Sequence, residues 1–281
     1  MYNRLGIEPP TDCAGLPAGV YSLTMPLPHP GETRLTNSAT GSAFPATRPS
    51  VIRALASADE VTRQRAFSTI AAIYWKPVYK YVRLRWRLGH EDSEDLTQDF
   101  FRLAFEKDWL AKFDAQRARF RTFVRTCVDG HVSNWHRAEH RVKRGGDSAA
   151  MTMDFALAEQ ELRDSAPAPD ADVEEFFQAE WVRAVFALAI ARLKTDCEES
   201  GKEVPFALFL RYDVSALETD ARPSYATLAR DFDLPETQVT NFLALARRRF
   251  RQHVLDALSE LTGSQEEYAE AVRELLGITP P

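Results

Sequence analysis

The sequence has few cysteines and no long apolar run. Its 281 residues include three scattered cysteines, Cys13, Cys127 and Cys197, and no metal-ligand spacing links them. An odd, dispersed set of this kind indicates a reducing compartment rather than a disulfide framework. No apolar run reaches the roughly 18 residues that a membrane helix needs. The first residues also lack the basic and then apolar layout of a signal peptide, so we predict a cytoplasmic protein without a membrane anchor.

Signatures of catalysis are equally scarce. There is no phosphate-binding glycine loop and no pattern typical of a nucleophile triad, so we expect neither enzymatic activity nor a cofactor. One string, His136 to His140, matches the H-x-x-E-H of inverted zinc peptidases, in which Glu139 would act as the base. This string lies in an arginine-rich segment, and no third metal ligand follows it. We therefore interpret His136 and His140 as surface histidines and predict no metal site.

Proline is concentrated at the start of the chain. Eight of the 16 prolines lie in residues 1–49, among many Ser, Thr and Gly residues and without periodic apolar positions. This composition predicts a disordered N-terminal extension over residues 1–43. From about residue 50 the apolar spacing predicts helices at 51–56, 60–73 and 74–88, with Pro77 in the first turn of the last.

The strongest charge feature is a cationic segment from Lys112 to Arg144. It holds nine Lys and Arg against three acids, a net charge of +6 in a chain whose total is −6. Apolar residues recur in it every three or four positions, which predicts a helix with one buried stripe. The stripe consists of Phe120, Phe123, Val124, Val128, Val132 and Trp135. A cationic helix with aromatics suits phosphates and unpaired bases, and a solvated charged helix is the alternative.

An acidic segment separates two helical halves. Residues 147–180 contain ten acids and one base, a net charge of −9, together with Pro167 and Pro169. This composition is typical of a linker, which we place at 147–175. We therefore predict an all-α fold with two helical domains, 44–146 and 176–262, followed by an acidic helix or tail at 263–281.

The second half contains a helix–turn–helix pattern between Arg222 and Phe250. Ser224 suits an N-cap, residues 232–234 suit a turn, and Pro235 suits the start of the second helix. The outward positions of that second helix are polar and then basic. These positions are Glu236, Thr237, Gln238, Thr240, Asn241, Arg247, Arg248, Arg249 and Arg251. Polar side chains at the helix start can meet base edges while arginines hold phosphates.

Together the motifs resemble bacterial RNA polymerase sigma factors of the extracytoplasmic-function (ECF) type, in the sigma-70 family. The resemblance is carried by four strings: F-x-x-T-R-x-S at 44–50, S-E-D-L-T-Q-D-F-F at 93–101, R-x-R-F-R-T-F at 117–123, and the helix–turn–helix at 225–250. It implies a sigma-2 helical bundle and a sigma-4 domain that bind core RNA polymerase and direct it to promoters. Pro49 departs from the family pattern, which has an aromatic there, and the leader and the acidic segments are additions.

The resemblance also implies roles for particular residues. Docking on the β′ clamp of polymerase would involve Glu94, Asp95, Leu96, Gln98, Asp99 and Phe101, and the sigma-4 domain would contact the β flap. Opening and reading of the −10 element would involve Arg119, Arg121, Asn134, Trp135, Arg137, His140 and Arg141. Recognition of the −35 element would involve Thr237, Gln238, Thr240, Asn241, Arg247 and Arg248.

An alternative is a sigma-like regulatory protein that binds polymerase or a partner without initiating transcription. Control is open to two hypotheses. The acidic linker (147–180) or tail (264–281) would mask a basic DNA-binding face, because their charges are opposite. Phosphorylation of Thr97 or Ser93 would change polymerase affinity through added negative charge. The resemblance allows an anti-sigma factor or a protein kinase as a further partner.

Overall fold

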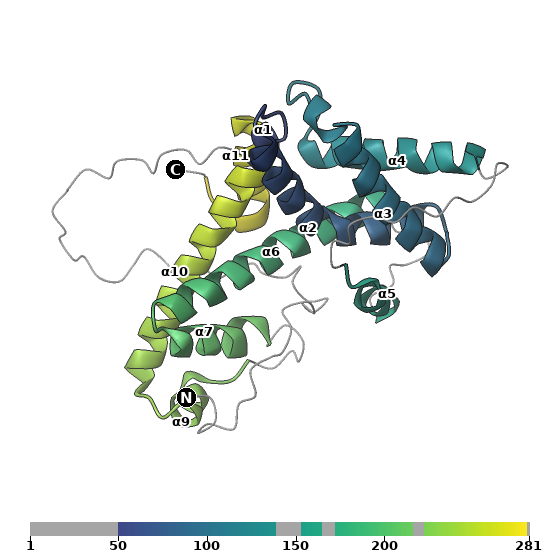
Figure 1. Cartoon of the computed structure of the whole chain (residues 1–281). Coiled ribbons are helices and arrows are strands. Elements are labelled where there is room, and N and C mark those ends of the chain that lie inside the picture. Colours follow the sequence, from purple (N-terminus) through teal and green to yellow (C-terminus); the bar gives the residue numbers. More distant parts are fainter. Residues whose placement is uncertain (1–49, 139–152, 165–171, 216–221, 280–281) are drawn as a thin grey trace.

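A computed structural model describes residues 50–138, 153–164, 172–215 and 222–279 (Figure 1). Within these ranges every regular element is a helix and none is a strand, so the all-α prediction is confirmed. No helix in these ranges is both long and apolar enough to span a bilayer. The elements are α1 (Val51–Ala54), α2 (Glu60–Arg85), α3 (His90–Glu106), the 3-10 turn η3 (Leu110–Lys112), α4 (Phe120–Ala138), α5 (Phe155–Asp164), α6 (Val173–Glu199), α7 (Glu203–Phe209), the π turn η4 (Leu210–Val214), α9 (Tyr225–Asp231), α10 (Glu236–Leu261) and α11 (Gln265–Leu276).

Helix α2 runs without interruption through Pro77, where two helices were predicted. A proline inside a helix removes one backbone hydrogen bond and costs about 3 kcal/mol. Here the ring is buried, and Tyr74, Val78 and Tyr81 on the same helix are almost fully buried as well. Burial of large side chains stabilises by about 1.5–3 kcal/mol each, which outweighs the lost hydrogen bond. The prediction of two helices was wrong because it rested on the local effect of the proline and did not include the packing of α2 in the core.

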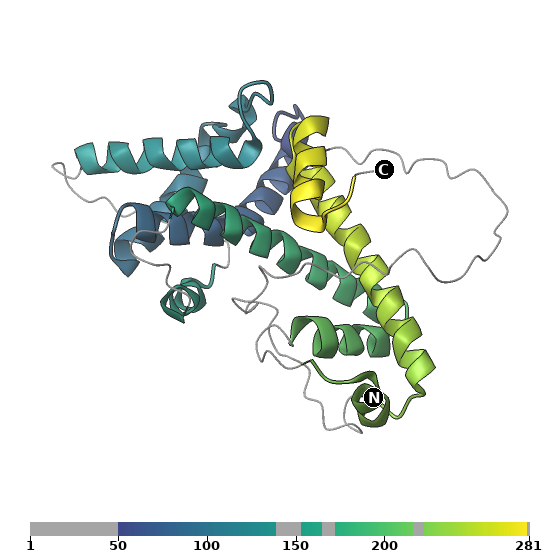
Figure 2. The same cartoon turned by 180° about the vertical axis from the view of Figure 1, so that it is seen from behind.

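The core of the molecule is shared by both halves of the chain. One cluster of buried residues includes Tyr74 of α2, Phe120 of α4, Trp181 of α6, Phe250 of α10 and Val272 of α11. Helices α2 and α6 cross in the middle of the molecule, and α10 lies along α6 (Figures 1 and 2). The described residues of 44–146 and 176–262 therefore pack as one body, which differs from two modules on either side of a linker.

A smaller cluster lies at the other end of α10. Leu208, Leu228, Val239 and Leu243 are fully buried there and join α7, α9 and the start of α10. This cluster fixes α9 against α10 at the end that lies farthest from α11 (Figure 2).

Part of the predicted linker is also helical. Residues 155–164 form α5, and α6 begins at Val173. Phe155 and Ala158 are buried against Tyr79, and the Phe155 ring lies edge-on to the Tyr79 ring at 5.2 Å between centroids. Phe155, Ala158 and Leu162 follow helical spacing, a signal that acidic composition concealed.

Candidate functional site

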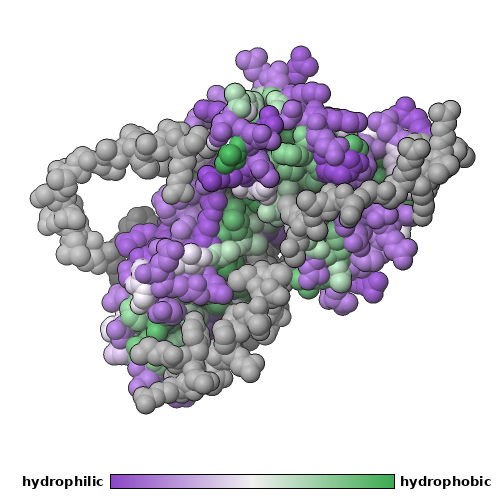
Figure 3. Space-filling model, viewed as in Figure 1, coloured by the Kyte–Doolittle hydropathy of each residue, from purple (hydrophilic) through white to green (hydrophobic). Residues whose placement is uncertain are grey.

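Helix α3 exposes a polar surface formed by Glu94, Asp95, Gln98 and Asp99, hereafter the α3 surface. Asp95 and Gln98 are exposed, whereas Glu94 and Asp99 are half-buried. Asp99 forms an ion pair with Arg102 within α3. Hydrophilic residues cover much of the described surface around α3 and α4 (Figure 3). Four of the six residues predicted to dock on polymerase thus lie together on one accessible face.

The other two predicted docking residues belong to the core. Leu96 is 3% exposed and Phe101 is 4% exposed, because they lie on the inward side of the helix. The Phe101 ring packs on Phe100 with 5.1 Å between centroids. In this fold Leu96 and Phe101 hold α3 in place and do not contact a partner, so their predicted contact role is corrected.

The phosphorylation hypothesis is also corrected. Ser93 and Thr97 have no exposed surface in the folded protein. The Thr97 hydroxyl donates to the Ser93 carbonyl at 2.7 Å, a contact within the helix. A kinase cannot reach either hydroxyl without unfolding α3, and a phosphate has no room beneath it. The same helical spacing that buries Leu96 also buries these two residues.

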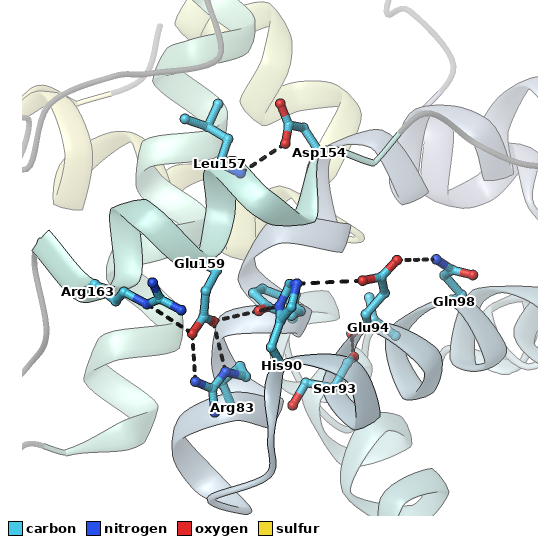
Figure 4. A network of polar contacts seen from close by, with 11 residues as sticks. Arg83, His90, Ser93, Glu94, Gln98, Asp154, Leu157, Glu159 and Arg163 are labelled. Atoms are coloured by element: carbon cyan, nitrogen blue, oxygen red, sulfur yellow. Dashed lines mark hydrogen bonds and ion pairs between the residues drawn. The ribbon is translucent and has the colours of Figure 1, made fainter.

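A polar network joins the start of α3 to α5 (Figure 4). The Tyr79 hydroxyl donates to the Glu159 carboxylate at 2.6 Å and lies 2.6 Å from Nδ1 of His90. The Arg83 guanidinium donates two hydrogen bonds to the same carboxylate, at 2.8 and 2.9 Å. Nε2 of His90 lies 3.8 Å from Glu94, so the network extends to the α3 surface. Helix α5 therefore supports the N-terminal end of α3, where the α3 surface begins.

We expect this network to make folding acid-sensitive. The hydrogen bonds from Arg83 lower the pKa of Glu159 to about 2, below its ordinary value of 4.5. A depressed carboxyl pKa contributes stability that is complete above about pH 5 and is lost as the pH falls toward 2. Glu159→Gln should therefore reduce the free energy of unfolding by up to about 3 kcal/mol at pH 7 and by much less at pH 3. Urea unfolding at both pH values measures this.

A matched control for that prediction is Asp164→Asn on the exposed side of α5. It should change stability by less than about 0.5 kcal/mol at either pH. An equal loss for Glu159→Gln at pH 7 and pH 3 would mean that the Glu159 charge contributes nothing.

The apolar stripe of the cationic helix is confirmed at four of its six positions, while Phe123 and Trp135 are half-buried. Phe120, Val124, Val128 and Val132 on α4 have no exposed surface. The helix begins at Phe120, later than the start of the cationic segment, and its described part ends at Ala138.

The arginines at the start of α4 contact acids from distant parts of the chain. Arg119 forms an ion pair with Glu270 of α11. Arg121 lies 3.1 Å from Glu274 of α11, and its guanidinium lies 5.0 Å from the centre of the Trp181 ring. Arg121 is 6% exposed, and Arg119 is exposed. Two residues predicted to act on the −10 element are therefore engaged within the protein.

The remaining described residues of that set lie at the opposite end of α4. Asn134 and Arg137 are exposed, and Trp135 is half-buried with its ring 5.0 Å from that of His136. A helix rises 1.5 Å per residue, so Asn134 lies about 22 Å along the axis from Arg119. Figure 1 shows this end of α4 projecting from the rest of the described molecule. The residues predicted at 139–141, including His140, Arg141 and Glu139 of the zinc motif, lie outside the described residues.

Helices α9 and α10 have the predicted helix–turn–helix arrangement. The Ser224 hydroxyl accepts from the Thr227 amide at 3.0 Å and caps α9, as predicted. Asp233 adopts the left-handed conformation in the turn, with φ of 53°. Pro235 is the N-cap of α10 and immediately precedes its first helical residue, Glu236. Val239 is buried against α9, which leaves the other side of the first turns accessible.

That accessible side is the α10 polar face, defined by Thr237, Gln238, Thr240 and Asn241. All four residues are exposed, as is Arg248 two turns later. Arg247 behaves differently, because its guanidinium donates two hydrogen bonds of 2.9 Å to the buried Asp213. Arg247 also lies 5.2 Å from the centre of the Tyr212 ring. Its predicted phosphate contact is corrected to a structural role that fixes α10 to the η4 turn.

The chain matches no family model, no curated protein and no solved structure. Its own geometry therefore carries the functional argument.

Proposed function

We propose that this protein is a sigma-type transcription initiation factor that binds core RNA polymerase and directs it to specific promoters. The observation that carries the proposal is the α10 polar face, in which four exposed polar side chains open the second helix of a helix–turn–helix. Side chains of this kind at a helix start fit the major groove and can read base edges. Arg248, farther along the helix, is available for a phosphate.

Two further surfaces support the same function. The α3 surface is acidic and accessible, which suits a basic helical hairpin such as the β′ clamp. The exposed end of α4 combines an amide, an indole and a guanidinium in Asn134, Trp135 and Arg137. An aromatic ring next to a cation suits unpaired bases and their backbone, as promoter opening requires. The proposal thus assigns −35 recognition to α10, and −10 recognition to the exposed end of α4.

A regulatory protein that binds polymerase without initiating transcription is the second candidate. The engagement of Arg119 and Arg121 by acids of α11 favours it, because these arginines are not free to hold DNA. Reconstitution with core polymerase separates the two functions. An initiation factor gives promoter-specific run-off transcripts from genomic fragments, and a purely regulatory protein gives none.

The same assay tests the α10 polar face. Gln238→Ala with Asn241→Ala should reduce run-off transcription and −35 footprinting by about 30-fold or more, since each lost base contact is worth about 1–3 kcal/mol. Gln252→Ala is the control, because it is an exposed glutamine on the same helix about 21 Å from Gln238. Normal footprints from the double variant would remove α10 from recognition.

A further inference from the structure

We propose that α11 is a built-in competitor for nucleic acid, whose carboxylates occupy the arginines at the start of α4 until a single-stranded DNA backbone displaces them. This inference rests on the proposed function and adds a control element to it. It assigns the masking role to the C-terminal helix, which the charge contrast alone left open between two acidic segments.

Three acids of α11 contact three consecutive residues, 119–121, at the start of α4. Glu267, Glu270 and Glu274 recur at helical spacing on one side of α11. Glu270 contacts Arg119, and Glu274 contacts Arg121 at 3.1 Å. Between them, a Glu267 oxygen accepts from the Phe120 amide at 2.9 Å. The start of a helix together with flanking arginines is a place where phosphate binds, so the carboxylates stand where phosphates would.

The two acids of α11 that pair with arginines are exposed enough for their contacts to be exchanged. The Arg119 and Glu270 side chains are 42% and 46% exposed, and an ion pair at such a site contributes about 0–1 kcal/mol. In the second pair Glu274 is 44% exposed but Arg121 is 7% exposed, so this arginine can exchange Glu274 only for another anion. Burial raises the pKa of Glu267, so keeping this carboxylate ionised costs free energy while α11 is packed against α4. Ala271 and Val272 are the fully buried apolar residues of α11, and Tyr268, Leu275 and Leu276 pack half-buried against the same core. A DNA strand that offers several phosphates can therefore replace this helix.

Helix α11 also covers Arg121. Arg121 is nearly buried, with Trp181 on one side and Glu274 on another. Gln178 of α6 also donates to Glu274 at 3.2 Å. Arg121 therefore becomes available to an outside ligand only when α11 moves. Helix α11 thus controls access to Arg121 in addition to neutralising its charge.

The test uses the full chain with Glu270→Gln and Glu274→Gln, which keep side-chain size and leave Glu267 and the apolar anchors intact. Binding to a fluorescein-labelled oligothymidylate of about 12 nucleotides is followed by anisotropy over a salt series. We expect affinity to rise about 10-fold at low salt. The slope of log K against log salt should steepen by about 1.4, because two more phosphates are neutralised at about 0.7 each.

The matched control is Glu199→Gln with Glu203→Gln, which removes the same charge from exposed positions at the end of α6 and the start of α7. It should change affinity by no more than about twofold. Adding Arg119→Gln to the Glu270/Glu274 variant should cancel part of its gain. Equal tightening in both double variants, or none in either, would overturn the competitor role.

A second measurement follows α11 directly. Amide hydrogen exchange of residues 264–276 in the wild-type protein should accelerate when the oligonucleotide is added. Unchanged or slower exchange would overturn the proposal. Run-off transcription separates this failure from that of the proposed function. If promoter-specific transcripts persist, only the α11 inference fails. Loss of both polymerase binding and transcripts in the wild-type protein would reject the function itself.

Discussion

Asp95→Lys with Gln98→Lys is expected to weaken binding to core RNA polymerase by at least about 100-fold, which corresponds to about 2.7 kcal/mol. Both side chains are exposed on the α3 surface, so the substitutions leave the core untouched. The proposed partner is a basic helical hairpin, and placing like charges in an interface costs several kcal/mol. Run-off transcription should fall with the affinity. Titration of labelled protein with core polymerase measures the change.

The control for this charge reversal is Glu199→Lys with Gln252→Lys. These residues are exposed and lie outside the α3 surface, and the change in net charge is the same. Polymerase affinity should remain within about threefold, since separated surface charges are screened by salt over about 10 Å. A folded α3 variant that binds polymerase like the wild type would show that the α3 surface is not the docking site.

Lys80→Met is expected to lower the free energy of unfolding by about 3 kcal/mol. The Lys80 side chain is 1% exposed, and its Nζ lies 2.8 Å from Glu161 and 2.9 Å from Glu180. Glu180 is itself 2% exposed, so the substitution leaves a buried carboxylate with one cation fewer. Methionine fills nearly the same volume, which confines the effect to charge. Urea unfolding should show a lower midpoint with an unchanged slope.

Two variants test whether the buried charge is the cause. Lys194→Met removes a lysine that is 40% exposed and lies 4.0 Å from Glu198, and it should cost less than about 0.5 kcal/mol. Lys80→Met combined with Glu180→Leu should recover part of the loss, because the unbalanced carboxylate is then gone although Arg183 loses its ion pair with Glu180. A loss below about 1 kcal/mol for Lys80→Met alone would contradict the interpretation.

Local features of the fold could be predicted from the sequence. The stripe of α4, the Ser224 cap and the α9–α10 turn depend on residues within about one helical turn of each other, and periodicity and capping reveal such relations. The burial of Thr97 was also visible, because Ser93, Thr97 and Phe101 recur four apart. The phosphorylation hypothesis does not take this spacing into account, although a helix turns every 3.6 residues.

Long-range features could not be predicted in this way. Arg119 and Glu270 are 151 positions apart, and no local pattern links them. The same holds for the core that α2 shares with α6 and α10. Opposite charge suggested that an acidic segment would meet the basic one, but only packing determines which acid meets which arginine. The helix within the predicted linker could not be predicted for a related reason, since composition does not show that Phe155 fits against Tyr79.

Helix α10 is long enough to connect two distant parts of the molecule. Its 26 residues form a single rod of about 39 Å, with the α10 polar face at one end. At the other end, the Ser50 hydroxyl donates to the backbone oxygen of Thr262 at 3.1 Å and ties the rod to α1. A tilt of about 10° about this pivot moves the far tip by about 7 Å, which is two base-pair steps. Because α10 packs along α6, such a tilt would carry α6 with it, and in the proposed function it would shift the α10 polar face on DNA by that distance.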